Sequence, residues 1–263
     1  MHPFINIAVN AARRAGKIIA QASQRLDRLK IAEKTSPYDL VTNIDKAAEE
    51  DIIETIRRAY PNHCILGEES GAINNDDTEI VWIIDPIDGT KNFIHGFPNY
   101  CVSIAVQRKG IVEQGVIYDP FKDELFLASK GEGAQLNGQR LRVSNCTNLM
   151  MALLSVDFNY KALGAHPEDH LNNAYKFLSK ESTIRQMGSS ALDLAYVAAG
   201  RLDGFIARGQ KIWDIAAGSI LIREAGGFIS DFVGGNTYLS SGEIVTGNTK
   251  IYPELLKLLI SSK

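Results

Sequence analysis

The spacing of apolar residues changes along this chain, and that change restricts the fold more than any other feature of the sequence. Residues 4–30 place apolar side chains on one face at helical spacing, which predicts an amphipathic helix. A second helical pattern follows Thr42 and ends before Pro61. Short apolar runs separated by glycine and proline then occupy residues 64–127 and favour β-strands. The chain is therefore predicted to combine helices and strands in an α/β (α+β) fold.

The second half of the sequence alternates between helical and extended patterns. Residues 191–199, 213–225 and 252–260 have helical spacing, and short apolar segments between them favour strands. No internal repeat, low-complexity tract or long linker interrupts the pattern. We therefore expect two interlocked α/β halves, residues 1–145 and 146–263, that form one unit.

The composition is typical of a globular protein in a reducing compartment. Hydrophobic residues make up 45% of the 263 residues, and the net charge of −3 gives no general attraction to nucleic acid or anionic lipid. The three cysteines form no C-x-x-C pair, which argues against disulfides and structural zinc. No apolar run is long enough to cross a membrane, and no signal peptide is visible. We expect a cytoplasmic protein with no membrane partner.

An acidic motif directly after an apolar segment carries the first chemical information. Residues 80–84 are typical of a strand, and Asp85 and Asp88 follow it. A strand end and a turn can direct two carboxylates at one point, although Asp-Gly is also common in ordinary turns. Gly89 permits close approach of a ligand, and a helix that begins at Thr90 would present unpaired N–H groups to a phosphate. Together these features would form one chemical unit.

Four further acidic residues could join this motif, although each also has a structural explanation. Asp45 falls in the first turn of the second helix, where a carboxylate favours the helix dipole. Glu68 and Glu69 fit an exposed turn, and Asp214 fits a helix cap. If these residues converge, their repulsion would raise pKa values or require cations. Oxygen ligands without histidine or thiolate favour Mg²⁺ over zinc or copper.

Four blocks of sequence, in this order, resemble the motifs of the inositol monophosphatase family. They are residues 40–45, 67–70, 85–93, and 213–218 followed by 224–227. The similarity covers nearly the whole chain, and it is greatest to the bacterial SuhB type of the family, as seen in residues 1–3, 6–9 and 191–201. The resemblance implies a layered αβαβα sandwich, a homodimer, and Mg²⁺-dependent, lithium-sensitive hydrolysis of inositol monophosphate.

The resemblance also assigns metal ligands. Glu68, Asp85 and the carbonyl group of Ile87 would bind a first Mg²⁺. A second would be held by Asp85, Asp88 and Asp214, and a weaker third would lie near Glu68.

A second group of residues is assigned by the resemblance to the water and the phosphate. Thr90, supported by Asp45 and Glu68, would orient the attacking water. Backbone N–H groups of Gly89 and Thr90 would hold the phosphate, beside Asp88.

The residues that would contact the substrate's alcohol match the family less completely. Lys34 matches a family lysine near the metal loop. Ser189 and Ser190 match a segment beside the sugar ring, although a helix cap explains them equally well. The family often has a glutamate that contacts a substrate hydroxyl where this chain has Ala207, followed by Arg208. Fructose 1,6-bisphosphate, a nucleotide 3′-phosphate and NADP therefore remain alternatives to inositol monophosphate as the substrate. Arg208 could face a more anionic substrate or simply solvent.

A function of another class is also open. Members of the SuhB type are associated with transcription antitermination complexes, so RNA polymerase and Nus factors are alternative partners. The sequence contains no aromatic-plus-basic motif of the kind that binds nucleic acid.

Overall fold

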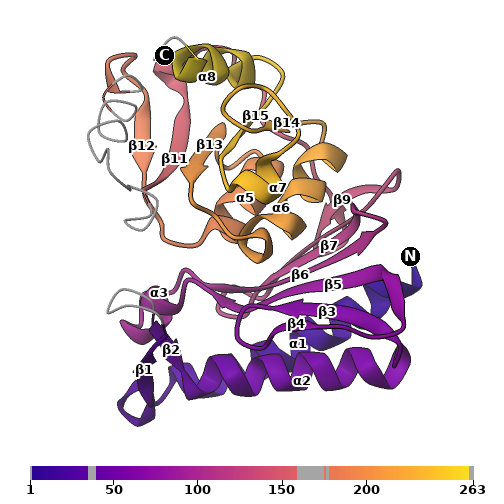
Figure 1. Cartoon of the computed structure of the whole chain (residues 1–263). Coiled ribbons are helices and arrows are strands. Elements are labelled where there is room, and N and C mark those ends of the chain that lie inside the picture. Colours follow the sequence, from indigo (N-terminus) through magenta and orange to yellow (C-terminus); the bar gives the residue numbers. More distant parts are fainter. Residues whose placement is uncertain (1, 35–39, 159–174, 176–177, 261–263) are drawn as a thin grey trace.

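Helices and sheets alternate as five layers in this computed structural model, which describes residues 2–34, 40–158, 175 and 178–260 (Figure 1). Helices α1 (Pro3–Ser23) and α2 (Asn43–Ala59) cover one face of a large sheet. Helices α5 (Ser190–Ala198) and α6 (Ile212–Glu224) lie between this sheet and a smaller one. Helix α8 (Ile251–Ile260) covers the far face of the small sheet. The predicted αβαβα sandwich is confirmed.

The large sheet has eight strands in the order β10-β9-β8-β7-β6-β5-β3-β4. Their bounds are β3 (His63–Gly67), β4 (Gly71–Ile73), β5 (Asp77–Asp88), β6 (Cys101–Arg108), β7 (Ile111–Asp119), β8 (Glu124–Ser129), β9 (Gly133–Leu136) and β10 (Gln139–Arg140). Strand β5 is longer than predicted. It continues past the apolar segment to Asp88, with a shift of register between Asp85 and Asp88. The predicted turn is therefore an irregular end of the strand, because the chain keeps its pairing with β6.

The small sheet has five strands in the order β12-β11-β13-β15-β14. Their bounds are β11 (Leu153–Phe158), β12 (Thr183–Arg185), β13 (Gly204–Arg208), β14 (Phe228–Ser230) and β15 (Ile244–Gly247). Strand β11 pairs in parallel with both β12 and β13. The remaining short elements are the ribbon β1 (Ile31–Glu33) and β2 (Leu40–Thr42), helices α3 (Thr90–Ile94) and α7 (Tyr238–Ser241), and the 3₁₀ turns η1 (Leu26–Arg28) and η2 (Leu149–Met151).

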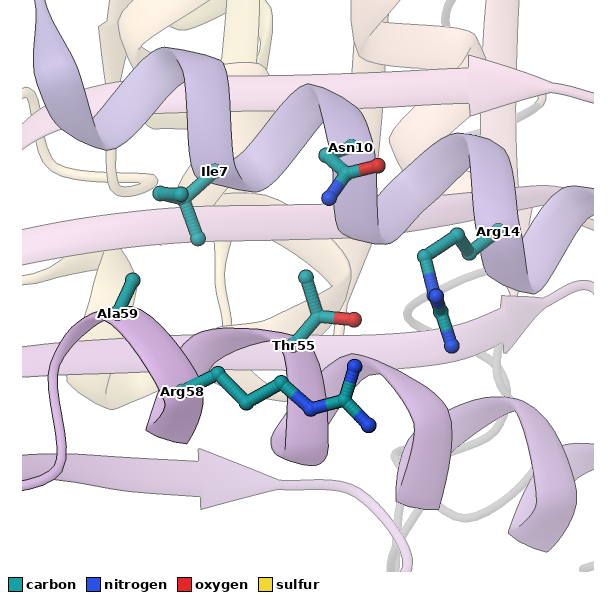
Figure 2. Close-up of a pocket in the computed structure, with 6 residues that line it drawn as sticks. All are labelled: Ile7, Asn10, Arg14, Thr55, Arg58 and Ala59. Carbon is teal, nitrogen blue, oxygen red and sulfur yellow. The ribbon is translucent and has the colours of Figure 1, made fainter.

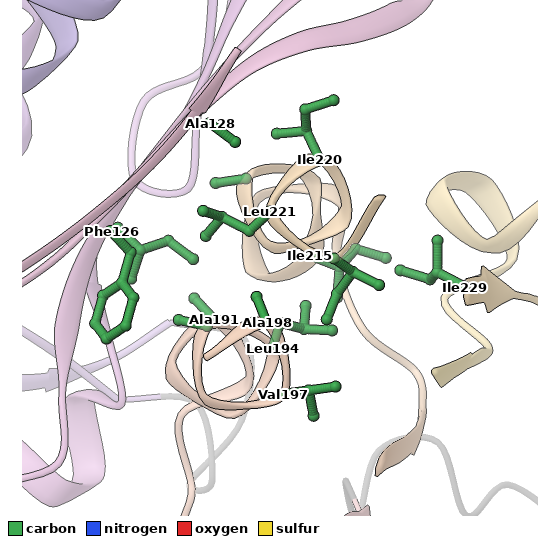
Figure 3. Close-up of a cluster of buried hydrophobic side chains, with 14 of the residues drawn as sticks. Phe126, Ala128, Ala191, Leu194, Val197, Ala198, Ile215, Ile220, Leu221 and Ile229 are labelled. Atoms are coloured by element: carbon green, nitrogen blue, oxygen red, sulfur yellow. The ribbon is translucent and has the colours of Figure 1, made fainter. Parts of the chain in front are cut away.

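The apolar core in the middle of the molecule fixes the two halves of the chain against each other. It brings together Phe126 of the large sheet, Leu194 of α5 and Leu221 of α6 (Figure 3). Burial of each such side chain stabilises the fold by about 1.5–3 kcal/mol. Helix α6 also packs directly on β5. The first turn of α6 is thus held beside the end of β5, while the division of the chain near residue 145 stays a prediction.

The first two helices differ in how well the sequence predicted their ends. Helix α1 ends at Ser23 instead of residue 30, because no apolar side chain is buried in the η1 turn that follows. Of the two possible caps of α2, Thr42 and Asn43, the structure has Thr42, in a reciprocal capping box with Asp45. No helix in the described parts of the chain is long and apolar enough to span a membrane.

Candidate active site

Three carboxylates from two distant segments meet where the large sheet faces α6. Asp85 and Asp88 stand at the end of β5, and Asp214 lies in the first turn of α6. One oxygen atom of each side chain lies within 4.8 Å of an oxygen of each of the others. No histidine or cysteine among the described residues belongs to this group. Three hard oxygen donors at this spacing can surround one Mg²⁺ ion.

Burial and mutual repulsion make these carboxyl groups hold their protons unusually strongly. Burial raises the pKa of Asp88 to about 7. Burial, followed by the charge of Glu68, raises the pKa of Asp85 well above its ordinary value. Burial and the charge of Asp88 do the same to the pKa of Asp214. A divalent cation would offset this repulsion, so the donor set fits Mg²⁺.

Hydrogen bonds fix how two of these carboxylates are oriented. The Ser189 hydroxyl donates to Asp88 Oδ2 at 2.6 Å, and the Ala191 N–H donates to the same oxygen at 2.7 Å. The Lys211 N–H donates to Asp214 Oδ2 at 2.7 Å. The sequence had suggested Asp214 as the cap of α6. The helix begins earlier, at Ile212, so Asp214 is its third residue. These bonds occupy only Oδ2 of each side chain.

Gly89 and Thr90 begin helix α3 beside the carboxylates, as predicted. Gly89 has a φ of +98°, and a Cβ atom there would lie 2.9 Å from the Asn99 carbonyl oxygen, so the position requires glycine. Thr90 Oγ1 lies 3.1 Å from Asp45 Oδ1 and 3.1 Å from the Ile87 carbonyl oxygen. The hydroxyl can donate to only one of them, and its lone pairs can accept a proton from a water molecule.

Asp45 links the start of α2 to this threonine. Its side chain is 0% exposed, and Oδ2 accepts the N–H of Thr42 at 2.8 Å and also the Thr42 hydroxyl. Burial raises the pKa of Asp45. The residue therefore caps its helix and also holds Thr90, so its structural and functional explanations are both compatible with the structure.

The turn that carries Glu68 is braced from two sides. Glu49 of α2, which is 2% exposed, accepts the N–H of Glu69 at 3.0 Å and that of Ser70 at 2.7 Å. Lys34 Nζ donates to Glu68 Oε1 at 2.8 Å and also bonds to Glu69. Burial raises the pKa of Glu69 to about 7, against the effect of Lys34. The explanation of Glu68 and Glu69 as a merely exposed turn is therefore wrong, since only 20% and 8% of these side chains are exposed.

Sequence reasoning missed two residues that support the carboxylates. Glu49 lies four positions after Asp45 on the same face of α2, and this spacing was a usable signal. Ser189 was assigned, with Ser190, to a segment beside the sugar ring or to a helix cap, whereas its hydroxyl bonds to Asp88. Nothing local predicts that contact, because it joins residues 101 positions apart.

The predicted contacts to the substrate's alcohol have different environments. Ser190 begins α5, and its hydroxyl lies 3.3 Å from Asp157 Oδ2. Ala207 is 1% exposed and its methyl group packs in the middle core. Arg208 is not simply solvated, because its Nη2 pairs with Glu243 at 3.0 Å.

A hollow of about 220 Å³ lies between α1 and α2 (Figure 2). It is lined by Ile7, Asn10, Arg14, Thr55, Arg58 and Ala59. Both arginines are paired, Arg14 with Asp51 and Arg58 with Glu54. At 1.5 Å per residue, Thr55 lies about 15 Å along α2 from Asp45. This hollow is therefore separate from the carboxylates.

The layered sandwich and its carboxylate group define a phosphatase-type protein. The sequence model of the inositol monophosphatase family matches residues 1–262, so this chain belongs to that family. The Nus factor SuhB of Escherichia coli strain K12 is 49% identical over 256 residues, which are 97% of this chain and 95% of that protein. The extragenic suppressor protein suhB of Bartonella henselae, in its native crystal structure, is 38% identical with a TM-score of 0.95 over 100% of both chains. An inositol monophosphatase from Anabaena is also 38% identical, with a TM-score of 0.87 over 98% of this chain and 95% of that one.

Proposed function

We propose that this chain is a Mg²⁺-dependent phosphomonoesterase that hydrolyses inositol monophosphate to inositol and phosphate. The observation that carries the proposal is the meeting of Asp85, Asp88 and Asp214 beside the start of α3 at Gly89 and Thr90. Membership of the inositol monophosphatase family supports the same class of activity.

In this proposal, the acidic residues hold the metal. Asp85, Asp88 and Asp214 would share one Mg²⁺, and Glu68, Asp85 and the Ile87 carbonyl group would share another. Bound Mg²⁺ would lower the pKa of water and neutralise charge on the phosphoryl oxygens. The braced turn keeps Glu68 close enough for its charge to act on Asp85.

The residues around α3 would act on the water and the phosphate. Thr90, fixed by its contact with Asp45, would accept a hydrogen bond from the attacking water and direct it at phosphorus. The N–H groups of Gly89 and Thr90 would stabilise the phosphoryl oxygens as their charge redistributes. Lys34 would limit the repulsion between the phosphate and the Glu68 turn.

Inositol monophosphate is the first substrate to test. A staphylococcal relative called SaIMPase-II, 30% identical over 97% of this chain and 93% of that one with a TM-score of 0.81, has been solved with inositol monophosphate bound. The same relative has also been solved with 2′AMP, which keeps nucleotide phosphates under consideration here. Fructose 1,6-bisphosphate, 3′-phosphorylated nucleotides and NADP complete the panel.

The decisive experiment measures phosphate release from inositol 1-phosphate with and without Mg²⁺, in the wild type and in Asp214→Asn. We expect Mg²⁺-dependent release in the wild type and almost none in the variant, with the variant's fold checked by thermal unfolding. Release that does not depend on Mg²⁺, or that survives the substitution, would contradict the proposal. We propose that lithium inhibits the reaction and that the active form is a homodimer, which inhibition curves and light scattering would test.

A second candidate function is that of a transcription antitermination factor. The observation that favours it is 49% identity to a Nus factor over 97% of the chain. Such a role would place the protein in the cytoplasm with RNA polymerase and Nus factors, and its surface would matter more than its chemistry. Retention of purified RNA polymerase and Nus factors by immobilised Asp214→Asn protein would support this role. No retention by the wild type would exclude it.

A further inference from the structure

Strand β11 carries another acidic side chain, Asp157, and none of the sequence motifs includes it. Its hydrogen-bond partners, Ser190 and Gln210, directly follow and precede the residues that bond to Asp88 and Asp214, which are Ser189 and Lys211. Asp157 is partly exposed, whereas Asp193 of α5 nearby is 1% exposed. After burial and other causes, the charge of Asp157 contributes to the raised pKa values of Asp88 and Asp214. Asp157 therefore lies within electrostatic range of two of the three clustered carboxylates.

Two hydrogen bonds hold Asp157, and both reach the same oxygen. Gln210 Nε2 donates to Asp157 Oδ2 at 2.8 Å, and Ser190 Oγ donates to it at 3.3 Å. Gln210 precedes α6 and Ser190 begins α5, the two helices whose N-terminal segments also hold the clustered carboxylates. Among the hydrogen bonds of the described residues, none reaches Asp157 Oδ1. One oxygen of a firmly held carboxylate is thus available as an acceptor.

The register of the small sheet relates Asp157 to the alanine that departs from the family pattern. Asp157 of β11 pairs directly with Ala207 of β13, and the two strands are parallel. Paired residues of adjacent strands project from the same face of a sheet. The small methyl group at Ala207 therefore leaves the carboxylate of Asp157 without a charged neighbour across this pair. A glutamate at position 207 would repel Asp157.

We propose that Asp157 is a specificity-determining residue that accepts a hydrogen bond, through Oδ1, from a hydroxyl of the alcohol part of a phosphate ester. Its preferred substrates are phosphates of polyols, whose hydroxyl groups can donate to it. Esters without such a hydroxyl bind without this contact and leave a charged acceptor unpaired. The inference rests on the proposed phosphatase function, because it places the ester's phosphate at the clustered carboxylates.

The test compares two substrates in Asp157→Asn. Asparagine keeps the oxygen that Gln210 and Ser190 use but replaces Oδ1 by an amide that cannot accept. We expect kcat/KM for inositol 1-phosphate to fall by about tenfold, mainly through KM, while kcat/KM for p-nitrophenyl phosphate stays within about twofold. The matched control is Asp123→Asn, a substitution on an exposed turn, which should change neither value. Equal losses on both substrates, no loss on inositol 1-phosphate, or a raised Mg²⁺ requirement would each overturn the inference.

The proposed phosphatase activity and the proposed role of Asp157 can be tested separately. Mg²⁺-dependent hydrolysis of p-nitrophenyl phosphate that Asp214→Asn abolishes reports the phosphatase itself. If neither ester is hydrolysed, that proposal falls, and calorimetric titration with inositol 1-phosphate and with inorganic phosphate decides the inference about Asp157. A loss of affinity in Asp157→Asn for the inositol ester alone supports it, and equal changes for both ligands overturn it.

A double variant tests the predicted repulsion between Asp157 and a glutamate at position 207, its partner on strand β13. We expect Ala207→Glu to improve KM for inositol 1-phosphate more in the Asp157→Asn background than in the wild type, because the repulsion is removed. Effects of the two substitutions that are independent of each other would contradict the relation.

Discussion

The two sides of the candidate active site are built from the sequence in different ways. On the side of the large sheet, Asp85, Asp88, Gly89 and Thr90 belong to one short stretch at the end of β5 and the start of α3. On the side of the small sheet, Asp157, Ser190 and Gln210 come from three separate segments. The stretch from Asp85 to Thr90 is thus defined largely by local sequence, although Asp214 of α6 must join it, whereas the proposed surroundings of the alcohol depend on how distant strands and helices align.

The largest loss of activity should come from removing a carboxylate from the stretch at the end of β5 and the start of α3. We expect Asp88→Asn to lower kcat/KM by about 100-fold or more, because it removes a carboxylate from the metal group. The same change should raise the Tm of the metal-free protein, since Asp88 adds to the repulsion that raises the pKa of Asp214. Initial rates and thermal unfolding in EDTA measure both effects. Near-normal turnover, or a lower Tm together with lost activity, would contradict this account.

A smaller effect is expected when the backbone of the local motif is changed without touching a charge. Gly89→Ala places a side chain at a φ of +98° and 2.9 Å from the Asn99 carbonyl oxygen, so the start of α3 must shift. We expect a loss of about 1–3 kcal/mol in unfolding free energy and at least about a tenfold lower kcat/KM. The control is Gly110→Ala, at a φ of +80° with nothing within 4 Å, which should lose stability but keep activity. Equal activity in the two variants would show that the backbone at Gly89 is not critical.

The turn that carries Glu68 is held by Glu49 of α2, one of the outer helices. Changing this support should lower activity less than the substitutions at Asp88 and Gly89. In Glu49→Gln, an amide replaces one of the two oxygens that accept the N–H groups of Glu69 and Ser70. We expect kcat/KM to fall several-fold, to about tenfold, and the Mg²⁺ concentration for half-maximal rate to rise. The neighbouring exposed Glu50→Gln is the control. A lower Tm with an unchanged Mg²⁺ requirement would mean that Glu49 serves stability alone.

The same contrast explains what the sequence could predict. The start of α2 just after Thr42 and the start of α3 at Thr90 depend on neighbours within a few residues, and helical periodicity and turn chemistry predicted them. The continuation of β5 through Asp88 depends on pairing with β6, which no local pattern records. Asp157 was missed for the same reason, because the role proposed for it follows only from the register with Ala207 and the bond from Gln210.

The smallest predicted effect concerns pH, and it tests whether the two sides share one electrostatic system. The raised pKa values, about 7 for Asp88 and for Glu69, mean that the folded protein binds more protons than the unfolded chain between about pH 4 and pH 7. This stabilisation is present below the unfolded pKa and is lost as pH rises through the folded value. Without metal, Tm should therefore fall as pH rises from about 5 to about 8.

Mg²⁺ should reverse that trend, because it binds the ionised carboxylates and displaces their protons. The increase in Tm on adding Mg²⁺ should thus be greater at pH 8 than at pH 5.5. Each kcal/mol by which Mg²⁺ stabilises the folded protein should raise Tm by about 2–4 °C. Asp157→Asn should flatten the metal-free curve only slightly, since the charge of Asp157 is a secondary cause of the raised pKa values of Asp88 and Asp214. Asp88→Asn should flatten it much more. If both variants flatten the curve equally, the two sides of the site are one coupled cluster, and the separation between chemistry and specificity does not hold.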